Sequence, residues 1–136
     1  MPRREPKWLA REHVEAIHAL QLALFGGLRG IRDVGALESA LGRPQHRWHD
    51  EADADLAACA AAYGFGLARN HAFADGNKRT AFVAMATFLA RNRCDLTATE
   101  PDAVATMLAV ATGDMTESDL AQWLRDNSTR RRRNRE

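Results

Sequence analysis

The sequence predicts an all-α protein, a helical bundle that forms a single domain. Apolar residues recur with a period near 3.6 along most of the chain, and strand signals are weak. Two of the helical segments are apolar on nearly every side, which is typical of helices at the centre of a bundle. The length of 136 residues fits one domain with a substantial core.

The first half of the chain contains two predicted helices with a glycine-containing segment between them. The first covers about residues 11–25 and ends at a glycine pair. Residues 26–33 are either a simple turn or a flap that grips a protein substrate beside a site. A short helix over about 35–42 is expected to end before Pro44, and residues 44–52 are predicted to be a polar loop.

Two apolar helices follow. An alanine-rich helix is predicted over about 54–69, with Asp53 or Asp55 as its N-cap. A second apolar helix is predicted over about 77–91. The residues between them form a loop whose two ends are fixed by the core.

The last part of the chain contains two shorter predicted helices. Residues 94–99 are the one candidate for an extended piece. Thr99 predicts the start of a helix with proline in its first turn, which ends near Gly113. Thr116 with Asp119 three residues later is typical of a capping box and predicts the last helix.

Composition and charge exclude several classes of protein. We assign residues 1–125 to the helical domain and residues 126–136 to a basic tail that is predicted to be disordered. Removing the tail's five arginines and two acidic residues from the totals of 19 and 18 leaves 14 basic and 16 acidic residues, so a nucleic-acid-binding body is not expected. No apolar run is long enough for a membrane span. Cys59 and Cys94 are predicted to be buried free thiols of a cytoplasmic protein.

Residues 71–79, His-Ala-Phe-Ala-Asp-Gly-Asn-Lys-Arg, lie between the two apolar helices. A helix N-terminus presents unpaired N–H groups and partial positive charge, which together bind phosphate. Gly76 lets an anion approach the backbone, and Asn77, Lys78 and Arg79 occupy the first helical turn, where the two cations add full charges. These four residues are therefore candidate phosphate ligands.

The same run supplies candidate catalytic groups. His71 can accept a proton from a hydroxyl nucleophile, and Asp75 suits Mg²⁺, which prefers carboxylate and phosphate oxygens. Phe73 is expected to insert into the core and anchor the loop. Taken singly, each residue also has an ordinary interpretation, with Asp75 as an N-cap and the histidine as a surface group. His46 and His49 are not expected to bind a metal, because partner ligands are missing.

The run from His71 to Ala81 resembles the signature of the Fic/Doc superfamily and is closest to its Doc branch, the death-on-curing toxins of bacterial toxin–antitoxin pairs. Segments 25–33, 37–44 and 111–113 resemble that branch in the same order, so the resemblance covers about residues 8–125. It implies a Fic-type helical bundle in which His71 activates a protein hydroxyl, Asp75 binds Mg²⁺, and Asn77, Lys78 and Arg79 hold the phosphates of ATP.

Two departures from the longer Fic pattern bear on the reaction. Lys78 replaces the second glycine of Gly-Asn-Gly-Arg-x-x-Arg, and Phe82 replaces its final arginine, while Ala72 follows the histidine where proline is common. The Doc-like pattern implies that the γ-phosphate of ATP faces His71, which makes Lys78 part of the catalytic set and the chain a protein kinase. The rival enzyme is an AMP transferase, and a non-catalytic helical binding module is the alternative of another class.

The resemblance also implies partners. The substrate would be a threonine of elongation factor Tu, whose modification blocks translation. A cognate antitoxin would cover the site with a disordered C-terminal segment that folds into an apolar groove between helices. No membrane or nucleic-acid partner is expected.

Overall fold

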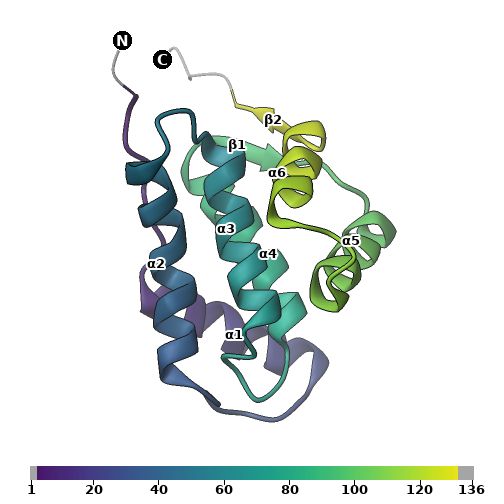
Figure 1. The fold of residues 1–136 in the computed structure, drawn as a ribbon. Helices are drawn as coiled ribbons and strands as arrows, with labels where there is room; N and C mark the ends of the chain where they lie inside the picture. The colour runs from purple at the N-terminus through teal and green to yellow at the C-terminus, as the bar shows by residue number, and fades with distance from the viewer. Residues whose placement is uncertain (1–2, 132–136) are drawn as a thin grey trace, which may run out of the picture.

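The computed structural model describes residues 3–131, which form a bundle of six helices with one two-stranded sheet (Figure 1). The predicted all-α, single-domain architecture is confirmed. In chain order the elements are α1 (Arg11–Phe25), α2 (Val34–Asp50), α3 (Leu56–Arg69), α4 (Asn77–Arg91), β1 (Cys94–Leu96), α5 (Glu100–Thr112), α6 (Glu117–Asp126) and β2 (Ser128–Arg130).

Helix α3 is the centre of the bundle and packs against α2, α4, α5 and α6. Eleven of its 14 residues are buried, as its alanine-rich sequence predicts. Its small residues allow close approach: a Cβ added at Gly64 would meet the Met85 sulfur at 2.2 Å, and one at Gly66 would meet the Ala40 Cβ at 3.1 Å. The Asp55 carboxylate caps the helix by accepting from the Ala58 N–H.

Helix α2 is longer than predicted, and the expected break at Pro44 is wrong. Proline inside a helix costs roughly 3 kcal/mol because it removes one hydrogen bond and crowds the preceding turn. Here Leu37, Ala40, Pro44 and Trp48 form one buried stripe with helical spacing. Burial of this stripe, which includes a large indole, offsets the local cost, so packing overrides propensity.

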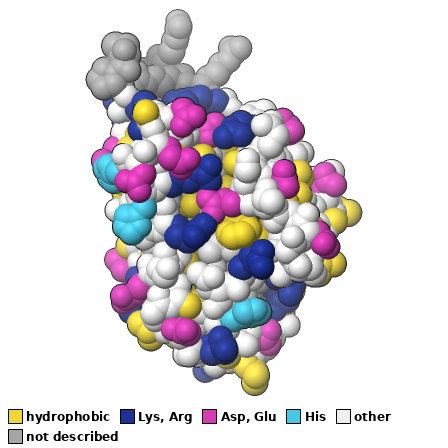
Figure 2. Space-filling view, viewed as in Figure 1, with side chains coloured by type: hydrophobic (Ala, Val, Ile, Leu, Met, Phe, Trp, Pro, Cys, Tyr) yellow, Lys and Arg dark blue, Asp and Glu magenta, His cyan; other side chains and the backbone are white. Residues whose placement is uncertain are grey.

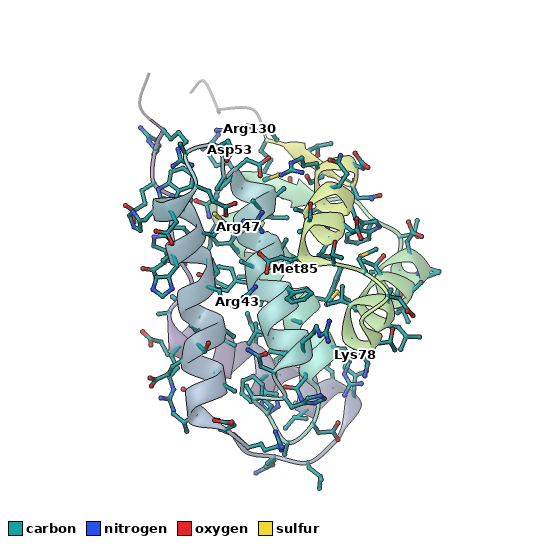
Figure 3. All side chains as sticks on the ribbon, in the orientation of Figure 1. Arg43, Arg47, Asp53, Lys78, Met85 and Arg130 are labelled. Carbon is teal, nitrogen blue, oxygen red and sulfur yellow. The ribbon has the colours of Figure 1, made fainter. Side chains whose placement is uncertain are left out.

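Helix α6 packs against α3 and is joined to α2 by ion pairs. Glu117 in its first turn accepts hydrogen bonds from Arg43 and Arg47, and its side chain is only 17% exposed. Figure 3 labels Arg43 and Arg47. Burial works to lower the pKa of Arg47, but its contacts with Glu117 outweigh that effect and raise it.

The caps and the sheet define the C-terminal part. The predicted caps Thr99 and Thr116 are confirmed, and Asp119 completes the capping box. Strand β1 fits the predicted extended piece and pairs antiparallel with β2. The tail expectation is therefore wrong for residues 128–130, which are ordered by this pairing, while residues 132–136 lie outside the described part.

The ends of the bundle differ in what they carry. The first described residues and β2 lie together at the top of Figure 1, whereas the α1–α2 and α3–α4 connections lie together at the bottom.

No helix among residues 3–131 has the length and apolarity that a membrane span requires. Cys59 is buried and Cys94 is only half-buried, and burial raises the pKa of the Cys59 thiol to about 12.

Candidate active site

The motif forms the α3–α4 loop and the first turn of α4, as predicted from its place between two apolar helices. The loop lies beside residues 26–33, which connect α1 to α2 and are called here the flap segment. An isolated antiparallel bridge joins Ile31 to Phe73, and the Ala74 N–H donates to the Gly30 carbonyl at 3.0 Å. The flap segment is therefore connected to the motif through the backbone.

Phe73 and Asn77 fix the shape of the loop. Phe73 is buried in the core, with 1% of its surface exposed. Asn77 closes the loop on itself, because its Oδ1 accepts from the Phe73 N–H at 3.0 Å and its Nδ2 donates to the Phe73 carbonyl at 2.9 Å. The predicted role of Phe73 as an anchor agrees with this geometry. The amide predicted as a phosphate ligand has its donor and its acceptor engaged within the protein.

His18 of α1 packs against the loop, and it was not predicted as a site residue. It is 6% exposed, and its ring stacks on Phe73 with centroids 3.8 Å apart and planes 10° apart. Its Nε2 lies 2.9 Å from the Asp75 carbonyl oxygen, so the protonated nitrogen donates to it. One imidazole thus contacts both the anchor and the acidic residue of the motif.

His71, the predicted base, is exposed to solvent at the start of the loop. Its φ of +51° is unusual for a residue with a side chain, and such strain is common at functional sites. The Arg32 side chain donates to the His71 carbonyl at 3.2 Å, and the Arg32 backbone N–H donates to the Ala72 carbonyl at 2.8 Å. The flap segment therefore stabilises the strained turn through the turn's backbone carbonyls, and the His71 residue stays exposed.

Asp75 is exposed and lies among positive groups. Its Oδ2 accepts from the Leu28 N–H at 3.2 Å and its Oδ1 accepts from the Gly76 N–H at 2.9 Å. These two hydrogen bonds are the main causes that hold the pKa of Asp75 below its ordinary value, and the charges of Arg79 and Lys78 act in the same direction. The carboxylate is ionised at neutral pH. It is not the N-cap of α4, because Gly76 holds that position.

The N-terminus of α4 brings the phosphate candidates together. Gly76 is left-handed, with φ of +75°, a conformation that glycine adopts without cost. The first intrahelical bond runs from the Thr80 N–H to the Gly76 carbonyl, so the preceding N–H groups have no helical acceptor. Lys78 and Arg79 are exposed beside these groups, and Figure 3 shows Lys78 at this end of α4. The Arg79 guanidinium lies 5.1 Å from the Phe25 ring centroid.

A cavity of about 490 Å³ opens between α1 and the flap segment. Its lining includes His18, Leu22, Gly27, Ile31 and Phe73, so it lies against the inner side of the motif. His71, Lys78 and Arg79 are instead open to solvent. The site therefore has an exposed reactive face and, next to it, a cavity lined by both polar and apolar side chains.

The flap segment supplies site residues that the sequence analysis missed. A Cβ at Gly27, where φ is +126°, would come within 2.7 Å of the Asp75 carboxylate, so this glycine makes room for the acidic group.

The sequence signal that could have identified His18 is its place in the buried stripe of α1, between Val14 and Gln21. His46 and His49 are exposed on α2, and residues 3–131 contain no group of three or more potential metal ligands.

Comparisons with known proteins agree on one family. Residues 8–89 match the sequence profile of the Fic/DOC family. The chain is 35% identical over 117 residues to the Protein kinase doc of Escherichia phage P1, an alignment that covers 86% of this chain and 92% of that protein. It is 48% identical over 75 residues to the Toxin Doc of Mycolicibacterium smegmatis, which covers 54% of this chain and 58% of that one.

Proposed function

The chain belongs to the Fic/Doc family, and we propose that it is a Doc-type toxin that transfers the γ-phosphate of ATP to a protein hydroxyl. The observation that carries the proposal is the exposed His71 in a strained turn, directly before an ionised Asp75 and the cationic N-terminus of α4. The relative named as a protein kinase spans most of the chain, which supports a kinase over other reactions of the family.

The residues at the site fit ATP and Mg²⁺. The N–H groups at the start of α4 with Lys78 and Arg79 would bind the phosphates, and the charge of both side chains suits a polyphosphate. Asp75 would hold Mg²⁺: each carboxylate oxygen accepts one backbone N–H and keeps further lone-pair capacity. A bound magnesium ion would neutralise part of the phosphate charge.

His71 would act as the general base. Its imidazole takes the proton of the target hydroxyl as that oxygen bonds to the γ-phosphorus, while the bond from the γ-phosphorus to the β–γ bridging oxygen breaks and ADP leaves. The Arg32 and Asn77 contacts hold the loop backbone while the exposed ring meets the protein substrate. Positioning and charge neutralisation would supply most of the rate enhancement.

AMP transfer is the second candidate reaction, and two residues argue against it. Lys78 stands where the longer Fic pattern has a glycine, and its side chain would fill the space that the glycine leaves for the α-phosphate. Phe82 stands where that pattern has an arginine, and its half-buried ring packs against the core. With no cation at this position, a nucleotide placed for α-phosphoryl attack would lack one phosphate ligand.

The target and the regulator are proposed from the family. We expect elongation factor Tu as the substrate, modified on a threonine in the cytoplasm, and a cognate antitoxin as the inhibitor. Several large apolar side chains are exposed on α1 and the flap segment beside the site, which supports protein binding there: Leu20, Leu24, Phe25 and Leu28. A folded antitoxin segment would cover these side chains and the adjoining cavity.

Labelled ATP tests the reaction directly. The purified protein is incubated with elongation factor Tu, Mg²⁺ and ATP labelled at either the α- or the γ-phosphate. Transfer of the γ label alone is expected, and transfer of the α label would replace the kinase by a nucleotidyl transferase. His71→Ala should reduce transfer by about 10²–10⁴-fold. His46→Ala, which changes an exposed histidine outside the site, is the matched control and should leave transfer unchanged.

A further inference from the structure

We propose that the end of the bundle opposite the active site binds the phosphate backbone of a nucleic acid. A cavity of about 420 Å³ opens there between the N-terminal segment, the start of α3, the end of α4 and β2. Six basic residues line it, which we call the terminal basic pocket: Arg3, Arg4, Lys7, Arg91, Arg93 and Arg130. In Figure 2 dark blue side chains lie at the top of the molecule, which is this end.

The charge of this pocket is positive after its carboxylates are counted. Three acidic residues also line it, Glu5, Asp53 and Asp55. Asp55 is neutralised by Arg125, which donates to both of its oxygens at 2.7 and 3.0 Å, and Glu5 accepts from the Trp8 indole at 2.8 Å. The remaining imbalance favours an anionic ligand.

Several of the cations have no partner among the residues that the structure describes. Within residues 3–131 the side chains of Arg4, Lys7, Arg91 and Arg130 make no hydrogen bond or ion pair, and all four residues are exposed. Arg91 also lies near the C-terminus of α4, where a cation stabilises the helix dipole. That explanation does not extend to Arg4 and Lys7, which precede α1, or to Arg130 in β2.

The fold creates this concentration from a chain of nearly neutral charge. The basic residues come from the first residues, the end of α4 and the last strand. The β1–β2 pairing places the last strand beside the chain that follows α4, and the Lys7 N–H donates to the Asn92 side chain at 2.8 Å. Figure 3 shows Arg130 near Asp53 at one end and Lys78 toward the other. The 15 residues of α4 separate the two ends by about 20 Å at 1.5 Å per residue, so the pocket is distinct from the ATP site.

An extended polyanion fits the pocket better than a compact one. After β2 the sequence also contains Arg132, Arg133 and Arg135, a run of like charge that suits an extended polyanion. The Arg3 guanidinium lies 3.7 Å from the Trp48 ring centroid and covers that ring, so a base has no aromatic face on which to stack. Recognition would then act through phosphates alone, without base preference and with strong dependence on salt.

Fluorescence anisotropy tests the proposal with three labelled probes: a 20-nucleotide single-stranded RNA, a 20-base-pair DNA duplex and a poly-glutamate peptide. We expect both nucleic acids to bind the full chain at low salt with micromolar Kd and the acidic peptide not to bind. For about four phosphate contacts, the slope of log Kd against log salt should be roughly 3 for the single strand and 3.6 for the duplex. The tighter of the two nucleic acids identifies the natural source of the phosphates.

Charge-reversal variants locate the site. Arg4→Glu with Lys7→Glu should weaken nucleic-acid binding at least tenfold at low salt. Arg11→Glu with Arg29→Glu makes the same change of charge outside the pocket and should have a several-fold smaller effect. Thermal unfolding of both double variants checks that the fold is intact, and Arg4→Gln with Arg91→Gln provides a milder pair if charge reversal prevents folding.

Four results would overturn the proposal. The first is equal binding by the pocket variant and the wild type. The second is complete loss of binding when residues 132–136 are deleted, with no effect of the pocket variants, which would assign binding to the tail alone. The third is tripolyphosphate binding at concentrations where neither nucleic acid binds. The fourth is binding of the acidic peptide instead of the nucleic acids.

Discussion

Asn77→Ala is the sharpest test of how the active loop is built. The substitution removes two side-chain hydrogen bonds to the Phe73 backbone, of 3.0 and 2.9 Å, in a half-buried position. Each such bond contributes about 0.5–1.5 kcal/mol, so about 2 kcal/mol of unfolding free energy should be lost. Alanine has the higher helix propensity in the first turn of α4, so the helix itself is not the cause.

Thermal unfolding followed by circular dichroism measures this loss. For a chain of this size, about 2 kcal/mol corresponds to a fall in Tm of roughly 6–10 °C. Asn70→Ala is the matched control, because Asn70 is exposed at the end of α3 and its side chain makes no hydrogen bond within the described residues. Asn77→Asp should be at least as destabilising, because its carboxylate would face the Phe73 carbonyl.

Measuring ATP affinity distinguishes the structural role of Asn77 in the loop from the phosphate-binding role predicted from the sequence. If Asn77 acted only as a phosphate ligand, Asn77→Ala would weaken ATP binding and leave the Tm within about 1 °C of the wild type. That outcome would show that the hydrogen bonds from Asn77 to Phe73 do not stabilise the loop. A fall in Tm together with weaker ATP binding is the expected result, since the loop carries both functions.

Three further predictions follow from the site and its surroundings. His18→Phe keeps the stack on Phe73 but removes the donor to the Asp75 carbonyl, so kinase kcat should fall severalfold while His18→Gln retains more activity; equal rates for both would contradict the role of that hydrogen bond. Gly27→Ala should weaken Mg²⁺-dependent activity more than Gly30→Ala, because both glycines have positive φ but only the Cβ at position 27 meets the Asp75 carboxylate. For Asp55, burial works to raise the pKa, but hydrogen bonds from Arg125 and the Ala58 N–H outweigh it and lower the pKa below its ordinary value of about 4. The contribution of the carboxylate to stability is therefore present above pH 4 and lost as the pH falls through the folded-state pKa. Asp55→Asn should destabilise the protein at pH 7, and the difference from the wild type should shrink as the pH is lowered below 4 in urea titrations.

The helices were predictable where local pattern and packing agree. The α3 and α4 segments are apolar on most sides, and Thr99 and Thr116 carry cap signals that need no tertiary information. The helix break expected at Pro44 does not occur, because the free energy that keeps α2 continuous comes from the burial of Trp48 against residues distant in sequence. Its signal, a stripe from Leu37 to Trp48 with helical spacing, continues across the proline.

The site was predictable in its reactive groups and not in its support. The motif placed His71 and Asp75 in one loop and the two cations in the following first turn of α4 because these residues are close in sequence. His18, Arg32 and Gly27 reach the loop through the crossing of α1 and the return of the flap segment, which is tertiary information. Strand β2 was missed for the same reason, since three polar residues form a strand only when β1 lies beside them.

The hydrogen bonds from Asn77 to Phe73 and the backbone bridge between Ile31 and Phe73 also affect ligand binding. Because both sets of contacts form within the protein itself, the loop is preorganised before ATP binds. Binding then sacrifices little conformational entropy, and most of the contact free energy remains available as affinity. An inhibitor shaped to this preorganised surface would gain the same advantage, whereas one that requires the loop to rearrange would first have to break these contacts.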